Sequence, residues 1–287
     1  LSNREMDSVV VFAANPSAFS TSETNHGVEA AARKRRFLLN IVSLDESDMD
    51  SVKARVRMGL SIRPAGVIVY EYDRAGIAAL EYIPKDMPMV VVGGSFGDGE
   101  YQVINAERDG GRWMTMHLLD LGHRTVFHVG RPEGPTDNTR TNGWRDALKE
   151  RGVTAPDPII VPDDDLEESV KAGRTLGRRG DVTAIFAGND ETAIAVIRGL
   201  REVGRRVPAD VSVVGFDDRN FGAMWNPALT SYTQNFLDMG ERSFRMLFEQ
   251  IQAKRAGDDA PPSQVEVVQG KPCLRASERA YGDGEIA

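Results

Sequence analysis

The sequence contains a single cysteine, Cys273, among its 287 residues. One cysteine excludes a disulfide within the chain and fits a reducing compartment such as the cytoplasm. The four histidines are scattered without the spacing of metal ligands, so we expect no metal site. No apolar run approaches the roughly 20 residues that span a bilayer, and the first residues lack the basic flank and apolar core of a secretory signal. These absences predict a cytoplasmic protein that does not enter the membrane.

The common signatures of catalysis are also missing. The chain has no Gly-x-x-x-x-Gly-Lys phosphate loop, no Gly-x-Ser-x-Gly nucleophile elbow and no His-Glu-x-x-His zinc helix. The glycine-rich segment 93–99 has the wrong spacing for dinucleotide binding, and no helix opens directly after it. The acidic run 163–165 lacks the alternating ligands and the glycine of a calcium loop, so it favours a solvated strand-to-helix turn. We therefore expect neither an enzyme nor a bound cofactor.

Acidic residues outnumber basic residues by 43 to 35, which gives the chain a formal net charge of −8. An acidic surface repels phosphate backbones, so the residues present are not expected to bind DNA by themselves. The basic run 33–36 lies at the end of the first predicted helix, where cations complement the helix dipole. A structural role explains this run better than a nucleic-acid patch does.

The chain does contain a repeated alternation of short apolar runs and amphipathic stretches. Near-continuous apolar runs are typical of strands that are covered on both faces, and the stretches between them have helical spacing. The alternation predicts an α/β fold of doubly wound, mostly parallel sheets with right-handed crossovers. The predicted strands are residues 9–13, 37–42, 66–70, 89–93, 126–130, 158–161, 182–187 and 211–216, and segment 265–268 has the pattern of one more.

A break in this alternation around residues 93–99 indicates two lobes. We expect the chain to pass between them near residue 104, to cross back after the extended segment 229–234, and to cross again near the proline pair 261–262. The predicted N-terminal lobe is therefore 1–104 plus 236–260, and the predicted C-terminal lobe is 105–235 plus 261–280. The tail 281–287 is expected to be loose.

Polar residues follow several of the predicted strands, and they are the candidate binding residues. Asn15, Arg140, Asn189 and Asp217 each come directly after, or a short loop beyond, a strand end. Ligands of open α/β sheets bind outside the carboxyl ends of the strands, so we expect these four side chains to open toward one cleft between the lobes. Carboxylate, amide and guanidinium groups together suit a polyhydroxylated or otherwise strongly polar small molecule.

Some of these positions have a second interpretation. Asn and Asp are common helix N-caps, and Asp190 fits a cap as well as it fits a ligand contact. Phe19 could supply an apolar face for a sugar ring. Trp225 could do the same, although packing explains it equally well.

The segment 207–218, VPADVSVVGFDD, and the segment 226–232, NPALTSY, resemble the effector-binding core of the lactose-repressor (LacI/GalR) family of transcription regulators. Matching pieces elsewhere are 67–69, 88–93, 110–111, 121–124, 140–144 and 186–190, so the resemblance runs from about residue 9 to residue 274. It implies a periplasmic-binding-protein-like fold of two lobes with three crossovers, an effector cleft between the lobes, and a homodimer.

By position, the resemblance assigns Arg140 and Asp217 as the most characteristic charges of the cleft. Asn105 stands where relatives often have an aspartate, and Asp165 stands where some have an aromatic that stacks on the ligand. Combined with the strand-end argument, the expected ligand-binding residues are Asn15, Phe19, Thr21, Asn105, Arg140, Asn189, Asp217 and Gln234.

The resemblance also predicts the function. The family reads operator DNA with an N-terminal helix-turn-helix head. This sequence begins almost at the first core strand, so we expect a truncated piece of such a regulator, with a stand-alone sensor as the alternative. We expect the effector-binding and dimerisation core of a repressor, with a sugar as the effector and purine-like or other polar metabolites as alternatives. The competing interpretation is the solute-binding protein of a sugar ABC transporter, which shares the fold and would need a secretory signal.

Overall fold

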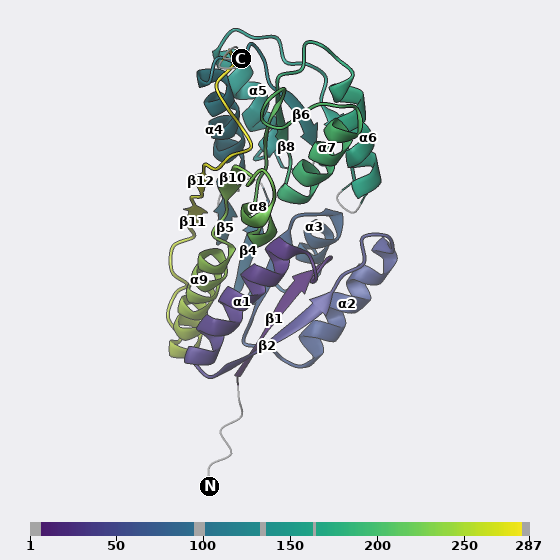
Figure 1. Cartoon of the computed structure of the whole chain (residues 1–287). Coiled ribbons are helices and arrows are strands. Elements are labelled where there is room, and N and C mark those ends of the chain that lie inside the picture. Colours follow the sequence, from purple (N-terminus) through teal and green to yellow (C-terminus); the bar gives the residue numbers. More distant parts are fainter. Residues whose placement is uncertain (1–6, 95–100, 133–135, 163–164, 283–287) are drawn as a thin grey trace. The chain divides into compact units, whose positions relative to one another are not determined.

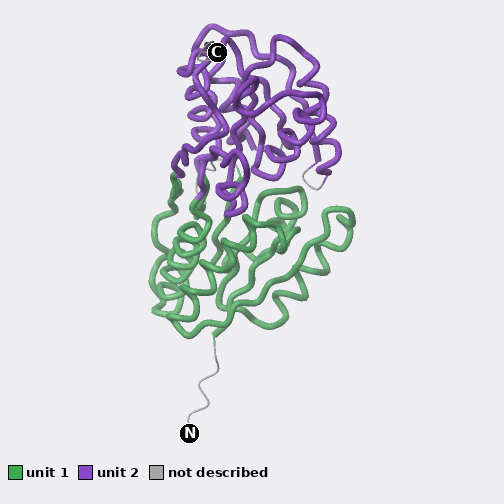
Figure 2. Tube along the Cα trace, in the orientation of Figure 1, with its two compact units in different colours: residues 1–105, 235–269 green, residues 106–234, 270–287 purple. Residues whose placement is uncertain are grey.

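The computed structural model describes residues 7–94, 101–132, 136–162 and 165–282 (Figure 1). The chain divides into two compact units (Figure 2). The first comprises Leu1–Asn105 and Asn235–Gln269, and the second comprises Ala106–Gln234 and Gly270–Ala287. Much of the 93–99 loop, residues 163 and 164 of the acidic run, and residues 283–287 of the expected tail lie outside the described residues.

The first unit contains a six-stranded sheet in which every neighbouring pair of strands is parallel. The strand order is β11-β5-β4-β3-β1-β2. The strands are β1 (Asp7–Ala13), β2 (Phe37–Ser43), β3 (Gly66–Glu71), β4 (Met89–Gly93), β5 (Gln102–Asn105) and β11 (Val265–Val268). The helices are α1 (Phe19–Lys34), α2 (Met49–Ser61), α3 (Arg74–Leu80) and α9 (Phe236–Ala256). The parallel order confirms the doubly wound α/β class that the sequence predicts.

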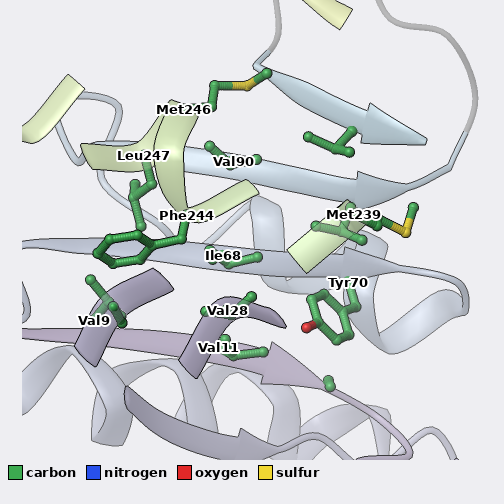
Figure 3. Close-up of a cluster of buried hydrophobic side chains, with 14 of the residues drawn as sticks. Val9, Val11, Val28, Ile68, Tyr70, Val90, Met239, Phe244, Met246 and Leu247 are labelled. Carbon is green, nitrogen blue, oxygen red and sulfur yellow. The ribbon is translucent and has the colours of Figure 1, made fainter. Parts of the chain in front are cut away.

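The alternation of side chains along β1 builds two apolar layers. Val9 and Val11 pack with α1 and α9, whereas Val10 and Phe12 pack with α2 and α3. Successive residues of a strand point to opposite faces, so a strand that is apolar at every position can bury both. Figure 3 shows the first of these layers, where Phe244 and other α9 residues lie over the valines of the sheet.

Helices α1 and α9 approach so closely that their backbones meet. A Cβ atom on Gly240 would lie 2.1 Å from the carbonyl oxygen of Thr24, and one on Gly27 would lie 2.1 Å from that of Leu237. Only glycine fits at such a crossing. The pair holds α9 against the sheet, although about 200 residues separate the two helices in the sequence.

The second unit has a parallel four-stranded sheet with the order β7-β6-β8-β9, and an antiparallel pair, β10 and β12. The strands are β6 (Phe127–Gly130), β7 (Ile159–Ile160), β8 (Ala184–Ala187), β9 (Ser212–Val214), β10 (Ser231–Thr233) and β12 (Lys271–Cys273). The helices are α4 (Glu107–Asp120), α5 (Arg140–Glu150), α6 (Leu166–Gly177), α7 (Asp190–Glu202) and α8 (Asn220–Met224). Ile185 and Ala187 of β8 belong to the layer under α6 and α7, while Ala184 and Phe186 belong to the layer under α4 and α5.

The expected lobes differ from the two units by one residue at Asn105 and at Asn235, and by a whole segment at residues 261–269. The sequence predicts segment 265–268 in the C-terminal lobe, but as β11 it pairs with β5 in parallel and belongs to the first unit. The last passage between the units therefore falls at Gln269 and Gly270 rather than near residue 261. The proline pair marks only the loop between α9 and β11. At the start of the expected tail, Tyr281 donates its backbone N–H to the carbonyl oxygen of Leu121 at 2.8 Å.

Candidate functional site

The candidate site of the second unit forms where the strands of its main sheet end. Arg140 is the first residue of α5, and Thr139 caps that helix by accepting the N–H of Asn142 at 3.1 Å. The cap fixes the start of α5, and with it the position of Arg140. Asp217 follows β9 by three residues, directly after a bend at Phe216.

Arg140 is the centre of the site, and only 7% of its surface is exposed. One terminal nitrogen of its guanidinium donates to Glu107 Oε1 at 3.2 Å and lies in an ion pair 2.9 Å from Asp217 Oδ1. The other donates to Asp217 Oδ2 at 3.3 Å and to the carbonyl oxygen of Gly188. The guanidinium carbon also lies 4.2 Å from the centre of the Phe216 ring, which is a cation–π contact.

The charges around Arg140 keep it ionised. Burial alone would lower the pKa of Arg140, but the carboxylates of Asp217 and Glu107 raise it above its ordinary value. Buried arginine is stable only when it is paired in this way, because an unpaired buried charge is costly. The two ion pairs therefore both hold the guanidinium and fix its direction.

Asp217 is held from a second side by Gln234. The Gln234 side chain donates its Nε2–H to Asp217 Oδ1 at 2.7 Å. Glu107, Arg140, Asp217 and Gln234 thus form one connected group, which we call the Arg140 cluster. Within the described residues, Arg140 Nε and Gln234 Oε1 are buried without a hydrogen bond. The cluster therefore retains one donor and one acceptor to satisfy.

Asn189 follows Gly188, which contacts the Arg140 cluster, but the Asn189 side chain itself caps a helix. It is the N-cap of α7, and its Oδ1 accepts the N–H of Thr192 at 2.8 Å. The preceding residue, Gly188, gives its carbonyl oxygen to Arg140. The capping interpretation of this segment thus holds for Asn189, and a contact between Asn189 and a ligand stays a prediction.

The other expected residues lie in the first unit. Asn15 is exposed in the turn before α1, where its Oδ1 accepts from the Ser17 hydroxyl at 2.9 Å and the Ala18 N–H at 3.2 Å. Thr21 is buried in the first turns of α1, and Phe19 packs edge to face on Phe236 with ring centres 5.8 Å apart. Asn105 is buried at the end of β5. Their part in ligand binding stays a prediction.

The described residues of the acidic run 163–165 and of the basic run 33–36 have the structural roles that the sequence favours, at a strand-to-helix turn and at the end of a helix. Asp165 caps α6 by accepting the N–H of Glu168 at 2.9 Å. Arg33 and Lys34 lie in the last turn of α1 and pair with Glu29 and Glu241. Among the described residues, no group of three or more His, Cys, Asp or Glu side chains could hold a metal ion. The helices described include none with the length and apolar character that crossing a membrane requires.

Sequence reasoning missed Glu107. It lies in the first turn of α4, where acidic residues usually complement the helix dipole, and this general preference hides its specific contact with Arg140. The one hint in the sequence is that Glu107 lies two residues after Asn105, which is an expected ligand-binding residue.

Comparison with known proteins places the chain in a family. Residues 115–277 match the Periplasmic binding protein-like domain. Over 267 residues the chain is 30% identical to the HTH-type transcriptional repressor PurR of Yersinia enterocolitica, covering 91% of this chain and 76% of that protein. The chain belongs to the LacI/GalR family of transcription regulators, as its effector-binding core.

Solved structures agree with this assignment. A dimeric Lac repressor with a C-terminal deletion matches with a TM-score of 0.82 and 23% identity, covering 96% of this chain and all of that one. The complex of the transcriptional regulator CelR with cellobiose matches with a TM-score of 0.79 and 25% identity, covering 96% of this chain and 86% of that one. The first likeness supports the fold, and the periplasmic-binding-protein-like class expected from the sequence is confirmed.

Proposed function

We propose that this LacI/GalR core binds an uncharged sugar through the Arg140 cluster and thereby alters the affinity of a DNA-reading head for its operator. The observation that carries the proposal is the buried contact of Arg140 with Asp217. A guanidinium and a carboxylate side by side can donate to and accept from neighbouring hydroxyl groups of one small molecule. The remaining donor of Arg140 and the remaining acceptor of Gln234 extend this pattern.

The charge balance of the cluster favours a neutral effector. One guanidinium stands between two carboxylates, those of Asp217 and Glu107. An anionic ligand, such as a sugar acid or sugar phosphate, would meet a positive group that is already neutralised and a surplus of negative charge. Hydroxyl groups carry no such penalty. The proposal therefore prefers neutral sugars to charged ones.

Regulation would arise from a difference in affinity between two states of the protein. An effector that binds one state more tightly shifts the population toward it, and the coupling to operator binding is reciprocal. We expect Asn15 and Thr21 of the first unit to contribute to the same ligand, and this stays a prediction. A regulator that acts on operator DNA works in the cytoplasm and needs no catalytic residues, so the proposal includes that location and a non-enzymatic role.

The proposal also includes a homodimer, and the second unit has a surface suited to a second copy. A hollow of about 600 Å³ is lined by apolar residues of α6 and α7 together with Trp225. Leu166 and Trp225 at this hollow are 48% and 38% exposed. Charged residues of both signs also line it, including Arg198 and Glu202. A two-fold interface brings a surface against itself, so a surface that carries apolar residues and charges of both signs allows self-pairing.

A thermal-shift panel tests the effector class. The chain would be heated with cellobiose, D-glucose, D-ribose, D-gluconate or guanine, because a ligand that binds the native state raises the melting temperature. We expect a neutral sugar to raise it and gluconate to leave it unchanged. Asp217→Asn should abolish the rise, while Asp258→Asn, at an exposed position, should keep it. Stabilisation by gluconate alone, or equal stabilisation of the Asp217→Asn protein, would contradict the proposal.

A further inference from the structure

Asp190 is fully buried, and both of its carboxylate oxygens are engaged by the segment after β9 or by β10. Its Oδ1 accepts from the Ser231 hydroxyl at 2.6 Å, and its Oδ2 accepts from the backbone N–H of Arg219 at 2.6 Å. Neither contact is a helix cap, since Asn189 caps α7. The sequence offered a cap or a ligand contact for Asp190, and these contacts fit neither.

The segment that Asp190 holds is the turn that carries Asp217. Asp217 and Asp218 have φ angles of 89° and 51°, in the left-handed region that residues with a side chain rarely adopt. Such a conformation persists only where surrounding contacts impose it. This turn is therefore a place where a few hydrogen bonds decide the direction of a side chain.

Three consecutive backbone N–H groups of the turn each have a fixed acceptor. The N–H of Asp217 donates to the carbonyl oxygen of Tyr232 at 2.8 Å. The N–H of Asp218 donates to Ser231 Oγ at 3.0 Å, and that of Arg219 donates to Asp190. Asp190 thus holds one of the three directly and a second through the Ser231 hydroxyl.

Space for this arrangement is provided by Gly215. A Cβ atom there would lie 2.2 Å from Asp190 Oδ1, closer than any side chain could approach. The glycine at the end of the strand and the buried carboxylate are therefore complementary in shape. A well-fitted carboxylate with two short hydrogen bonds is a specific structural element, not an accident of packing.

We propose that Asp190 is a positioning residue for Asp217: it sets the turn that directs the Asp217 carboxylate at Arg140, and so sets effector affinity without touching the effector. The effector part of this inference rests on the proposed function. The positioning part does not, because it concerns only the turn and can be observed without a ligand.

The surroundings of Asp190 make its protonation near neutral pH an observable of the positioning role. Burial, followed by the nearby charges of Asp217 and Asp218, raises the pKa of Asp190 to about 7. The other charged or titratable groups of this region are already paired: Arg140 with Asp217, Arg275 with Asp218 at 2.6 Å, Cys273 with Asp218 at 3.2 Å, and Arg219 with Glu191 at 2.6 Å. The protonation of Asp190 is therefore the change that the turn should report near neutral pH.

Both protonation states can hold the turn, but with opposite hydrogen-bond directions. In the ionised state the Ser231 hydroxyl donates to Asp190 Oδ1. In the protonated state Asp190 donates to Ser231 Oγ, while Oδ2 still accepts from Arg219. Asp190→Asn reproduces the second arrangement, because its amide can donate to Ser231 and its oxygen can accept from Arg219. This variant should keep the turn and lose the titration.

The first test uses the ligand-free chain and the ¹H–¹⁵N amide signals of Asp217, Asp218 and Arg219 between pH 5.5 and 8.5. In the native protein we expect the Asp218 and Arg219 signals to titrate with one midpoint near 7, and in Asp190→Asn to be independent of pH. In Asp190→Ala, exchange of the Arg219 amide with solvent should rise by about tenfold or more as local opening becomes easier. Ser231→Ala should accelerate exchange at Asp218 alone, which keeps the test available if Asp190→Ala does not fold. Unchanged amide signals and exchange in Asp190→Ala and Ser231→Ala would overturn the inference.

The second test measures cellobiose and D-ribose binding by calorimetry at pH 6. For a sugar that binds the native protein, Asp190→Ala should weaken binding about tenfold, and Asp190→Asn should remain within about threefold of the native affinity. Asp258→Ala, an exposed acid, is the control for loss of one negative charge and should not change it. Equal affinity in Asp190→Ala would overturn the effect on the effector. If neither sugar binds the native protein, the sugar assignment fails, while the amide measurements still decide the role of Asp190.

Discussion

Arg140 and Asp217 are separated by 77 positions in the sequence, yet their side chains meet at 2.9 Å with almost no exposure to solvent. Arg140 begins the helix that follows β6, and Asp217 follows β9; the parallel order of the sheet brings the carboxyl ends of both strands to one edge. Glu107 approaches the same guanidinium from α4. A buried ion pair of this kind supports stability, and the proposed function also gives it a part in ligand binding, so we expect a change at either residue to affect both.

Asp217→Ala should therefore destabilise the protein as well as weaken effector binding. The substitution leaves the buried Arg140 with Glu107 as its remaining ionic partner, and removal of one member of a buried pair costs about 3–5 kcal/mol. Glu107 offsets part of this cost, so we expect the lower end of that range. Urea unfolding of the two proteins measures the difference. An unchanged midpoint would show that the pair contributes nothing to the fold.

Leu166→Asp should convert a dimer into a monomer. Leu166 lies at the edge of the hollow between α6 and α7 and is 48% exposed in the single chain. In a self-complementary interface the new carboxylate would be buried on both copies. Loss of a buried apolar anchor typically costs about 2 kcal/mol or more, which is roughly thirtyfold in dissociation constant. Sedimentation equilibrium measures this. Leu274→Asp, at a similarly exposed leucine of the same unit, is the matched control and should remain dimeric.

The sequence predicted the strands well because they are read from short-range patterns. Met89–Gly93 and Val265–Val268 have the expected bounds, since apolar runs between turn residues fix them locally. The predicted strand 211–216 is longer than β9, which ends at Val214, because the chain bends at Phe216 and continues into the left-handed Asp217. Such a turn depends on contacts with Ser231 and Asp190, which no local pattern records.

Two features were harder to predict: which unit β11 belongs to, and the buried acidic residues Glu107 and Asp190. The parallel pairing of β11 with β5 joins segments about 160 residues apart, so a proline pair was a poor guide to the last crossing. Glu107 and Asp190 both lie in the first turn of a helix, where acidic residues are common for general reasons. Their specific roles depend on which strand ends lie nearby. Arg140 and Asp217, in contrast, were predictable because both follow strands directly or after a short loop.

Gly240→Ala should destabilise the first unit. The added Cβ would lie 2.1 Å from the carbonyl oxygen of Thr24, so α1 and α9 would have to separate. Overpacking of this kind costs about 1–3 kcal/mol or more. Chemical denaturation measures the loss. Gly257→Ala is not a suitable control, because its φ of 76° makes it strained for another reason, whereas Gly180→Ala has open space around it and should change stability little.

His128 gives the stability of the protein a dependence on pH with a known sign. It is enclosed by Trp144 and Phe186, donates from Nδ1 to the Phe186 carbonyl at 2.8 Å, and accepts from the Thr141 hydroxyl at Nε2. Burial lowers the pKa of His128 from 6.5 to about 4. Between these values the unfolded chain binds more protons than the folded one. Stability from this group is therefore lost as the pH falls from 6.5 to 4.

Asp190 gives stability a pH dependence of the opposite sign over much of the same pH range. Single variants of Asp190 and His128 should separate the two effects. Burial raises the pKa of Asp190 from 3.8 to about 7, so its contribution is present below 3.8 and is lost as the pH rises through 7. One proton of difference corresponds to a slope of about 1.4 kcal/mol per pH unit in the free energy of unfolding.

Asp190→Asn removes a contribution to stability that falls as the pH rises. Relative to the native protein, the stability of this variant should therefore rise with pH between 4.5 and 6. His128→Gln removes a contribution to stability that rises with pH. Relative to the native protein, the stability of this variant should therefore fall with pH over the same range. Urea unfolding at pH 4.5, 5.25 and 6 measures both slopes, and slopes that change in the same direction in the two variants would contradict the assignment of either buried group.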